Sequence, residues 1–115
     1  MKKDCIFCKM SAGEISVEKI YENDNFFSVK DINPKVDGHS IVICKKHFET
    51  SLDIPSSLGL ELIDCIKNTY IKLSKNLECE GFNLVGNNFE AAGQEIKHVH
   101  FHILPRRKGD GFKVI

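Results

Sequence analysis

The segment that decides the fold is His98-Val99-His100-Phe101-His102-Ile103-Leu104-Pro105, in which three histidines alternate with apolar residues. An alternation of period two is typical of a half-buried β-strand and not of a helix. It predicts His98, His100 and His102 on one face of the strand, each about 6.6 Å from the next. The chain has 5 histidines, so this face is expected to carry most of them.

Imidazole groups in this arrangement have two chemical uses. An unperturbed pKa of about 6.5 allows histidine to act as an acid, a base, a nucleophile or a metal ligand near neutral pH. Cys5 and Cys8 form a Cys-x-x-Cys pair near the start of the chain, which indicates a metal knuckle or a redox pair. Two unrelated cysteines are the remaining interpretation. From spacing alone, catalysis and metal binding both stay open.

Length and composition favour one ordinary globular domain. At 115 residues, we expect residues 1–115 to form a single domain. Lys plus Arg and Asp plus Glu are balanced at 16 each, which leaves no net charge to attract nucleic acid or an anionic membrane. We expect no signal peptide and no membrane span, because the apolar runs are too short. The odd number of cysteines, 5, favours a reducing cytoplasm over a disulfide scaffold.

The pattern of elements predicts an α+β domain. Five runs have the composition or alternation of strands: residues 17–22, 26–32, 39–44, 82–85 and 98–105. The polar, glycine-flanked loop at 86–94 joins the last two as a hairpin, and its backbone N–H groups could hold a phosphate. Apolar residues at helical spacing predict one long helix from Pro55 to about Cys79, with Gly81 at its C-terminal cap. A short helix is expected between the Cys-x-x-Cys pair and Gly13. We therefore expect an antiparallel sheet of about five strands with one long and one short helix.

Ordered motifs along nearly the whole chain resemble the histidine triad (HIT) family of nucleotide hydrolases and transferases. The histidine segment has the family's pattern of three histidines separated by apolar residues. Asp31-Ile32-Asn33-Pro34 followed by Gly38-His39, and Asn87 followed by Gly93-Gln94, are similar to the HINT-like nucleoside phosphoramidase branch. Residues 103–106 look like the bacterial members. The resemblance implies a single HIT domain.

The resemblance also implies a role for each matched residue. His100 resembles the nucleophile that attacks the α-phosphorus to form a nucleotidyl-histidine intermediate, which divides one hard displacement into two easier ones. His102 resembles the neighbour that binds phosphate and helps to protonate the leaving group, with His39 supporting it. Gln94, together with the backbone amides of Gly93 and its neighbours, would stabilise phosphoryl oxygens, and Asn87 lies in the same loop. Asp31 would bind the ribose. The base would be surrounded by Ile6, Phe7 and Ile15. For the last three, plain core packing is the competing interpretation.

One position departs from the family pattern. Many relatives place Ser or Thr after the Gly-Gln pair, where its hydroxyl can donate to phosphate or to the leaving group. This chain has Glu95, an anion beside an expected anion-binding site. Either the carboxylate turns away, or it favours a cationic leaving group such as an amine.

A structural zinc site is the second expectation. Cys5 and Cys8 supply two thiolates, and a Cys₂His₂ site needs two histidines besides those used in catalysis, which leaves His47 and His98. Some HIT proteins and related uridylyltransferases bind zinc through a matching set. Two sulfurs and two imidazoles suit a closed tetrahedral Zn²⁺.

The resemblance implies a cytoplasmic hydrolase of purine nucleoside phosphoramidates, meaning AMP or GMP conjugates, that forms homodimers as its relatives do. A dinucleoside polyphosphate hydrolase is the nearest alternative, and a nucleotide-binding regulator without turnover is an alternative of another class. A hydrolase with a catalytic zinc on the triad is disfavoured, because His98 and His102 would lie roughly 13 Å apart along a flat strand.

Overall fold

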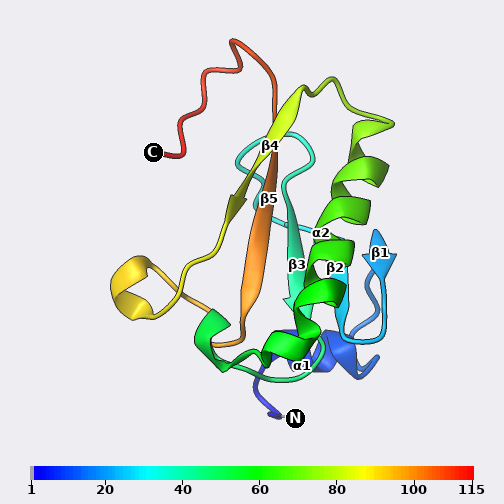
Figure 1. Ribbon diagram of the computed structural model, residues 1–115, viewed down its shortest axis with the longest axis vertical. Helices are drawn as coiled ribbons and strands as arrows, with labels where there is room; N and C mark the ends of the chain where they lie inside the picture. The colour runs from blue at the N-terminus through cyan, green and yellow to red at the C-terminus, as the bar shows by residue number, and fades with distance from the viewer. Residues whose placement is uncertain (1) are drawn as a thin grey trace.

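The computed structural model describes residues 2–115, and it confirms the predicted five-stranded antiparallel sheet with one long and one short helix (Figure 1). The strand order is β1-β2-β3-β5-β4, and each neighbouring pair is antiparallel. The strands are β1 (Tyr21–Glu22), β2 (Phe26–Lys30), β3 (Ser40–Cys44), β4 (Gly81–Val85) and β5 (His100–Arg106). The helices are α1 (Ile6–Ser11) and α2 (Gly59–Ser74), with single 3₁₀ turns at η1 (Ser51–Asp53), η2 (Ser56–Leu58) and η3 (Glu90–Ala92).

The register of the central strands decides which residues share a face of the sheet. Ile43 pairs with His100, and Ile41 pairs with His102, across β3 and β5. Because side chains alternate along each strand, these four residues point to one face, whereas Ile103 of β5 points to the other. The sheet thus separates a face that carries histidines from a face that is mainly apolar.

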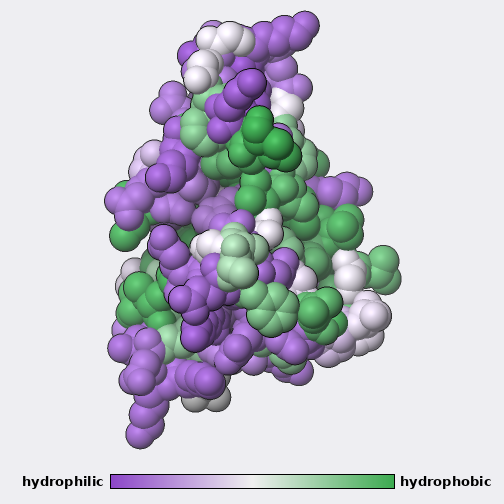
Figure 2. All heavy atoms as spheres, turned by 90° about the vertical axis from the view of Figure 1, so that its left-hand side faces the viewer, coloured by the Kyte–Doolittle hydropathy of each residue, from purple (hydrophilic) through white to green (hydrophobic). Residues whose placement is uncertain are grey.

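The outer strand β4 keeps apolar side chains at the surface. Its Phe82 and Leu84 are 37% and 46% exposed, while Tyr70 of α2 stacks on the Phe82 ring at 4.4 Å between centroids. Figure 2 views the molecule from the left-hand side of Figure 1 and shows apolar residues gathered among polar ones on this side. An exposed edge strand of this kind is available for further pairing.

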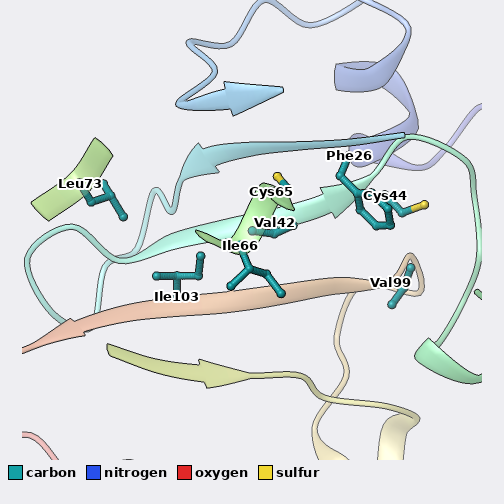
Figure 3. Close-up of a cluster of buried hydrophobic side chains, with 8 residues drawn as sticks. All are labelled: Phe26, Val42, Cys44, Cys65, Ile66, Leu73, Val99 and Ile103. Carbon is teal, nitrogen blue, oxygen red and sulfur yellow. The ribbon is translucent and has the colours of Figure 1, made fainter. Parts of the chain in front are cut away.

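Helix α2 covers the apolar face of the sheet. Its Cys65, Ile66 and Leu73 are buried against side chains of the strands, as Figure 3 shows. The full cluster of buried residues is Phe26, Val42, Cys44, Cys65, Ile66, Leu73, Val99 and Ile103. The predicted helical stripe is therefore core packing.

Several predicted boundaries differ from those in the structure. Helix α2 ends at Ser74 instead of Cys79, where the Ser74 hydroxyl donates to the carbonyl of Ile71 and so competes with the backbone ladder. Gly81 is not the helix cap, because it begins β4 and pairs with Arg106. The first strand, β1, keeps only two of the residues predicted for it.

The short helix α1 lies on the other side of the sheet. Cys5 is its N-cap, and the Cys5 sulfur accepts from the Cys8 amide at 3.4 Å. Phe7 of α1 is buried against Phe27 and Ile43 in a second apolar cluster. This cluster occupies one end of the histidine-bearing face and leaves the rest of that face open. Among residues 2–115, no helix has both the length and the apolar character needed to cross a bilayer.

His98 lies just before the histidine strand, although its ring is on the same side of the sheet as that of His100, since the Phe7 ring contacts both. Strand β5 begins at His100, and the amides of His98 and Val99 donate to Ile96 and Phe48 instead of to a neighbouring strand. The His98 side chain is fully buried.

Candidate active site and metal centre

A cleft of about 820 Å³ opens on the sheet face opposite α2. It is lined by almost all the residues that the resemblance assigned to chemistry or to substrate: Ile6, Phe7, Asp31, His39, Asn87, Gly93, Gln94, Glu95, His100 and His102. Ile15 is not among the lining residues. Its amide donates to the Lys9 carbonyl just beyond α1, and its expected place beside the base stays a prediction. The C-terminal residues Phe112, Lys113 and Val114 also line the cleft, which no sequence signal indicated.

The protonation of His100 follows from one contact. Its Nδ1 lies 2.7 Å from the carbonyl oxygen of His98. A carbonyl oxygen only accepts, so Nδ1 carries the proton of the neutral ring. The lone pair is therefore on Nε2, at the opposite end of the ring. This is the tautomer that a nucleophilic imidazole needs.

A chain of hydrogen bonds sets the tautomers of His39 and His102. The Lys35 amide donates to Nδ1 of His39 at 3.0 Å, so the proton of a neutral His39 is on Nε2. His39 Nε2 lies 2.9 Å from Nδ1 of His102 and donates to it. His102 is then left with a proton on its own Nε2. The Lys35 amide was not found from the sequence, because every residue except proline offers one.

Burial keeps both of these rings neutral. It lowers the pKa of His102 to about 4, with a smaller contribution from His100, and it also lowers the pKa of His39. The Asp31 carboxylate opposes the shift in both rings, since its Oδ2 lies 3.4 Å from Nε2 of His39 and 3.9 Å from Nδ1 of His102. At neutral pH the relay therefore consists of neutral imidazoles beside one carboxylate.

Asp31, His39 and His102 also lie close enough to hold a metal ion. The hydrogen bond from Lys35 argues against that use. A His39 ring that accepts at Nδ1 carries its proton on Nε2, the atom that would have to bind the cation. The three residues fit a hydrogen-bond relay better than a metal site.

Gln94 does not have the phosphate-binding role expected of its side chain. Its Nε2 donates to the carbonyls of Glu49 at 2.6 Å and Ile96 at 3.2 Å, and its Oε1 accepts from the Phe89 amide at 2.8 Å. Both amide hydrogens are used, so the side chain has none left for a phosphoryl oxygen. Gln94 instead holds the loop between β4 and β5 in shape.

The loop amides are also partly occupied. The amides of Gly93 and Gln94 donate to Glu90 and Phe89 within the loop. Among residues 2–115, the Glu95 amide has no such partner, so it is one loop donor at the cleft that remains for an anion. The Glu95 side chain is exposed at the cleft. Phe89 holds the loop in a backbone conformation, φ 73° and ψ 157°, that is otherwise almost confined to glycine.

The second site brings Cys5, Cys8, His47 and His98 together from α1, the loop after β3 and the segment before β5. The four ligand atoms lie within 4.8 Å of one another. Three of the separations are 3.2 Å from Cys5 Sγ to His98 Nδ1, 3.3 Å from Cys8 Sγ to His47 Nδ1, and 3.1 Å between the two Nδ1 atoms. Tetrahedral zinc with ordinary bond lengths separates its ligands by about 3.3–3.8 Å. The donor set and its spacing fit such an ion.

The surroundings of the two cysteines and two histidines suit metal binding as well. His98 Nε2 donates to the Cys44 carbonyl at 2.6 Å, which leaves Nδ1 as the ligand atom. Burial lowers the pKa of His98 to about 4 and raises the pKa of the Cys5 thiol. A divalent cation binds neutral imidazole and stabilises thiolate, so it satisfies both groups. The Cys44 carbonyl is a second contact that the sequence did not reveal.

A scan against protein families finds the HIT domain over residues 12–109. The chain belongs to the HIT family. The two cysteines lie before the matched range, so the family match itself does not depend on the metal site.

Curated relatives of the HIT protein include three informative cases. An uncharacterized HIT-like protein of Methanocaldococcus jannaschii is 44% identical over 93% of this chain and 82% of its own length. Adenylylsulfatase HINT3 of Arabidopsis thaliana is 38% identical, and adenosine 5'-monophosphoramidase HNT1 of Saccharomyces cerevisiae is 35% identical. The match to the first enzyme covers 96% of this chain and 56% of that protein, and the match to the second covers 90% and 63%.

Solved structures give the same family and fold. A Streptococcus mutans protein matches with a TM-score of 0.90 and 34% identity, over 100% of this chain and 73% of that one. A zinc-bound histidine triad protein of Mycobacterium smegmatis matches with a TM-score of 0.87 and 31% identity, over 96% and 81%. A relative with the same fold therefore binds zinc.

Proposed function

We propose that this HIT protein hydrolyses purine nucleoside phosphoramidates and related α-phosphate esters, and releases the nucleoside monophosphate. The observation that carries the proposal is the 2.7 Å bond from Nδ1 of His100 to the His98 carbonyl, because it leaves the lone pair of a neutral imidazole on Nε2. The monophosphoramidase and adenylylsulfatase names of two relatives support a reaction at the phosphorus of a nucleotide.

The reaction proceeds in two displacements. The bond from His100 Nε2 to the α-phosphorus forms as the phosphorus–nitrogen bond of the substrate breaks, and the departing amine takes a proton from water. His102 donates from Nε2–H to that water or to a phosphoryl oxygen. The hydroxide then attacks phosphorus, and the bond to His100 breaks. The relay from the Lys35 amide through His39 keeps His102 in the donating tautomer throughout.

The rest of the cleft binds the nucleotide. The Glu95 amide donates to a phosphoryl oxygen, and Asp31 accepts from ribose hydroxyls. Ile6 and Phe7 form the apolar wall for the base, and Asn87 and Gly93 shape the loop side. The Glu95 carboxylate stands on the side of the leaving group, where it favours a departing amine over a second phosphate.

Zinc is the metal that we propose for Cys5, Cys8, His47 and His98. Four protein ligands close the coordination sphere, so the ion would supply cross-linking and no catalysis. Five free cysteines in the chain are consistent with a reducing cytoplasm, where we place the protein.

A homodimer is proposed for the assembly. The exposed Phe82 and Leu84 on edge strand β4 support it, because a second copy could cover both side chains and pair with the edge. Light scattering of the parent protein and of Leu84→Lys tests this. We expect a dimer that the substitution converts to a monomer, and a monomeric parent contradicts the proposal.

The test of function is a substrate panel with a nucleophile variant. We expect the parent protein to cleave an adenosine phosphoramidate faster than a dinucleoside tetraphosphate, and rapid quench to trap a nucleotidyl adduct. His100→Ala should bind AMP but form no adduct. If His100→Ala keeps a tenth of the parental turnover, the activation barrier has risen by only about 1.4 kcal/mol, and His100 is ruled out as the nucleophile. Binding without turnover in the parent indicates a regulator, and faster cleavage of the tetraphosphate indicates the polyphosphate hydrolase.

A further inference from the structure

The metal site and the proposed nucleophile share two direct contacts. The Phe7 ring, between the cysteines on α1, lies 5.6 Å from the His98 ring and 5.0 Å from the His100 ring, in an edge-to-face arrangement with both. The main-chain carbonyl of His98 accepts the Nδ1 proton of His100. The ring of His100 is therefore in contact with the backbone of His98, a metal ligand, and with Phe7, which lies between the ligands Cys5 and Cys8.

We propose that Phe7 and the His98 carbonyl are positioning elements through which the metal site holds the His100 ring in its attacking orientation. The role in turnover rests on the proposed function, whereas the orientation of the ring does not. The site would thus act on the chemistry as well as on stability.

The connection is mechanical. Helix α1 has only six residues, and a helix of that length is not stable by itself. The metal ligands join α1 to the loop after β3 and to the segment before β5. Without the metal, Phe7 and the His98 backbone are each less firmly held, so Nδ1 of His100 loses a fixed acceptor. A displacement of about 1 Å at a reacting group is enough to lower a rate by about 100-fold.

The experiment compares the full chain with Cys8→Ser and Phe7→Leu. Long-range ¹⁵N NMR reports the tautomer of His100, metal analysis reports zinc, and rapid quench reports adduct formation. Ser11→Ala is the matched control on α1, because it removes only the hydroxyl bond to the Lys45 carbonyl. We expect the parent and Ser11→Ala to show one His100 tautomer, protonated on Nδ1.

Cys8→Ser should lose zinc and show mixed His100 tautomers, with adduct formation slower by at least about tenfold and AMP affinity within about twofold of the parent. Phe7→Leu should keep zinc yet show the same change in the NMR signals of His100. A single Nδ1-protonated tautomer in both variants overturns the proposal. If Cys8→Ser fails to fold, Phe7→Leu decides alone. If no adduct forms even in the parent, the proposed function fails, and the tautomers still test the positioning.

Discussion

Nε2 of His39 lies 2.9 Å from Nδ1 of His102, although the two residues are 63 positions apart in the chain. His39→Leu removes the donor that fixes the tautomer of His102. We expect kcat for a phosphoramidate to fall by about 10- to 100-fold, less than the roughly 100- to 10,000-fold contribution of a positioned proton donor because His102 itself remains, while the AMP dissociation constant changes little. Steady-state kinetics with calorimetry measures both. Unchanged kcat would show that the relay does not serve turnover.

The lowered pKa of His102 predicts acid sensitivity. Its pKa is about 4 in the folded protein and about 6.5 when unfolded, so the fold favours the neutral ring. The contribution of the neutral His102 ring to the free energy of unfolding is fully present above pH 6.5 and is lost as the pH falls toward 4. The expected loss between about pH 7.5 and about pH 5 is about 2 kcal/mol of unfolding free energy. Urea titrations at the two pH values measure it, and His102→Asn should show a smaller loss by that amount. Equal losses contradict the prediction.

Glu95→Ser tests the leaving-group side of the cleft. A carboxylate repels a second phosphate but does not repel a departing amine, so the substitution should shift preference toward the dinucleoside tetraphosphate. We expect the ratio of the two kcat/KM values to change by about 1–3 kcal/mol, the usual size of coupling between sites. Glu95→Gln is the control for size. Constant ratios across all three proteins would show that the carboxylate points into solvent.

Phe89→Gly should stabilise the protein. The φ of 73° and ψ of 157° at Phe89 cost a non-glycine residue about 1–3 kcal/mol, and its ring is 56% exposed, so little burial is lost. Glycine also makes the unfolded chain more flexible, which reduces this gain in stability by about 0.5–1 kcal/mol. The net gain is about 1 kcal/mol, or a Tm higher by about 4 °C. Phe89→Ala keeps the strain and should gain nothing. A lower Tm for Phe89→Gly would show that the ring makes stabilising contacts.

The sequence by itself predicted the class of fold, the sheet of five strands and most of the residues in the two sites. Alternation along β5, turn residues and helical spacing are local properties, and local patterns follow from backbone geometry. The Cys-x-x-Cys pair and the histidines left over from the triad led to the four residues that the structure brings within reach of one metal ion.

Only the tertiary structure decided how these groups act. Alternation placed His98 on the strand, but β5 begins at His100, and the buried His98 ring lies beside Cys5 and Cys8. Gln94 looked like a phosphate ligand, but two carbonyls use both of its hydrogens. The tautomers of the histidines in the cleft depend on the Lys35 amide and the His98 carbonyl. Backbone groups are the same in every residue except proline, so their partners become known only when the chain is folded.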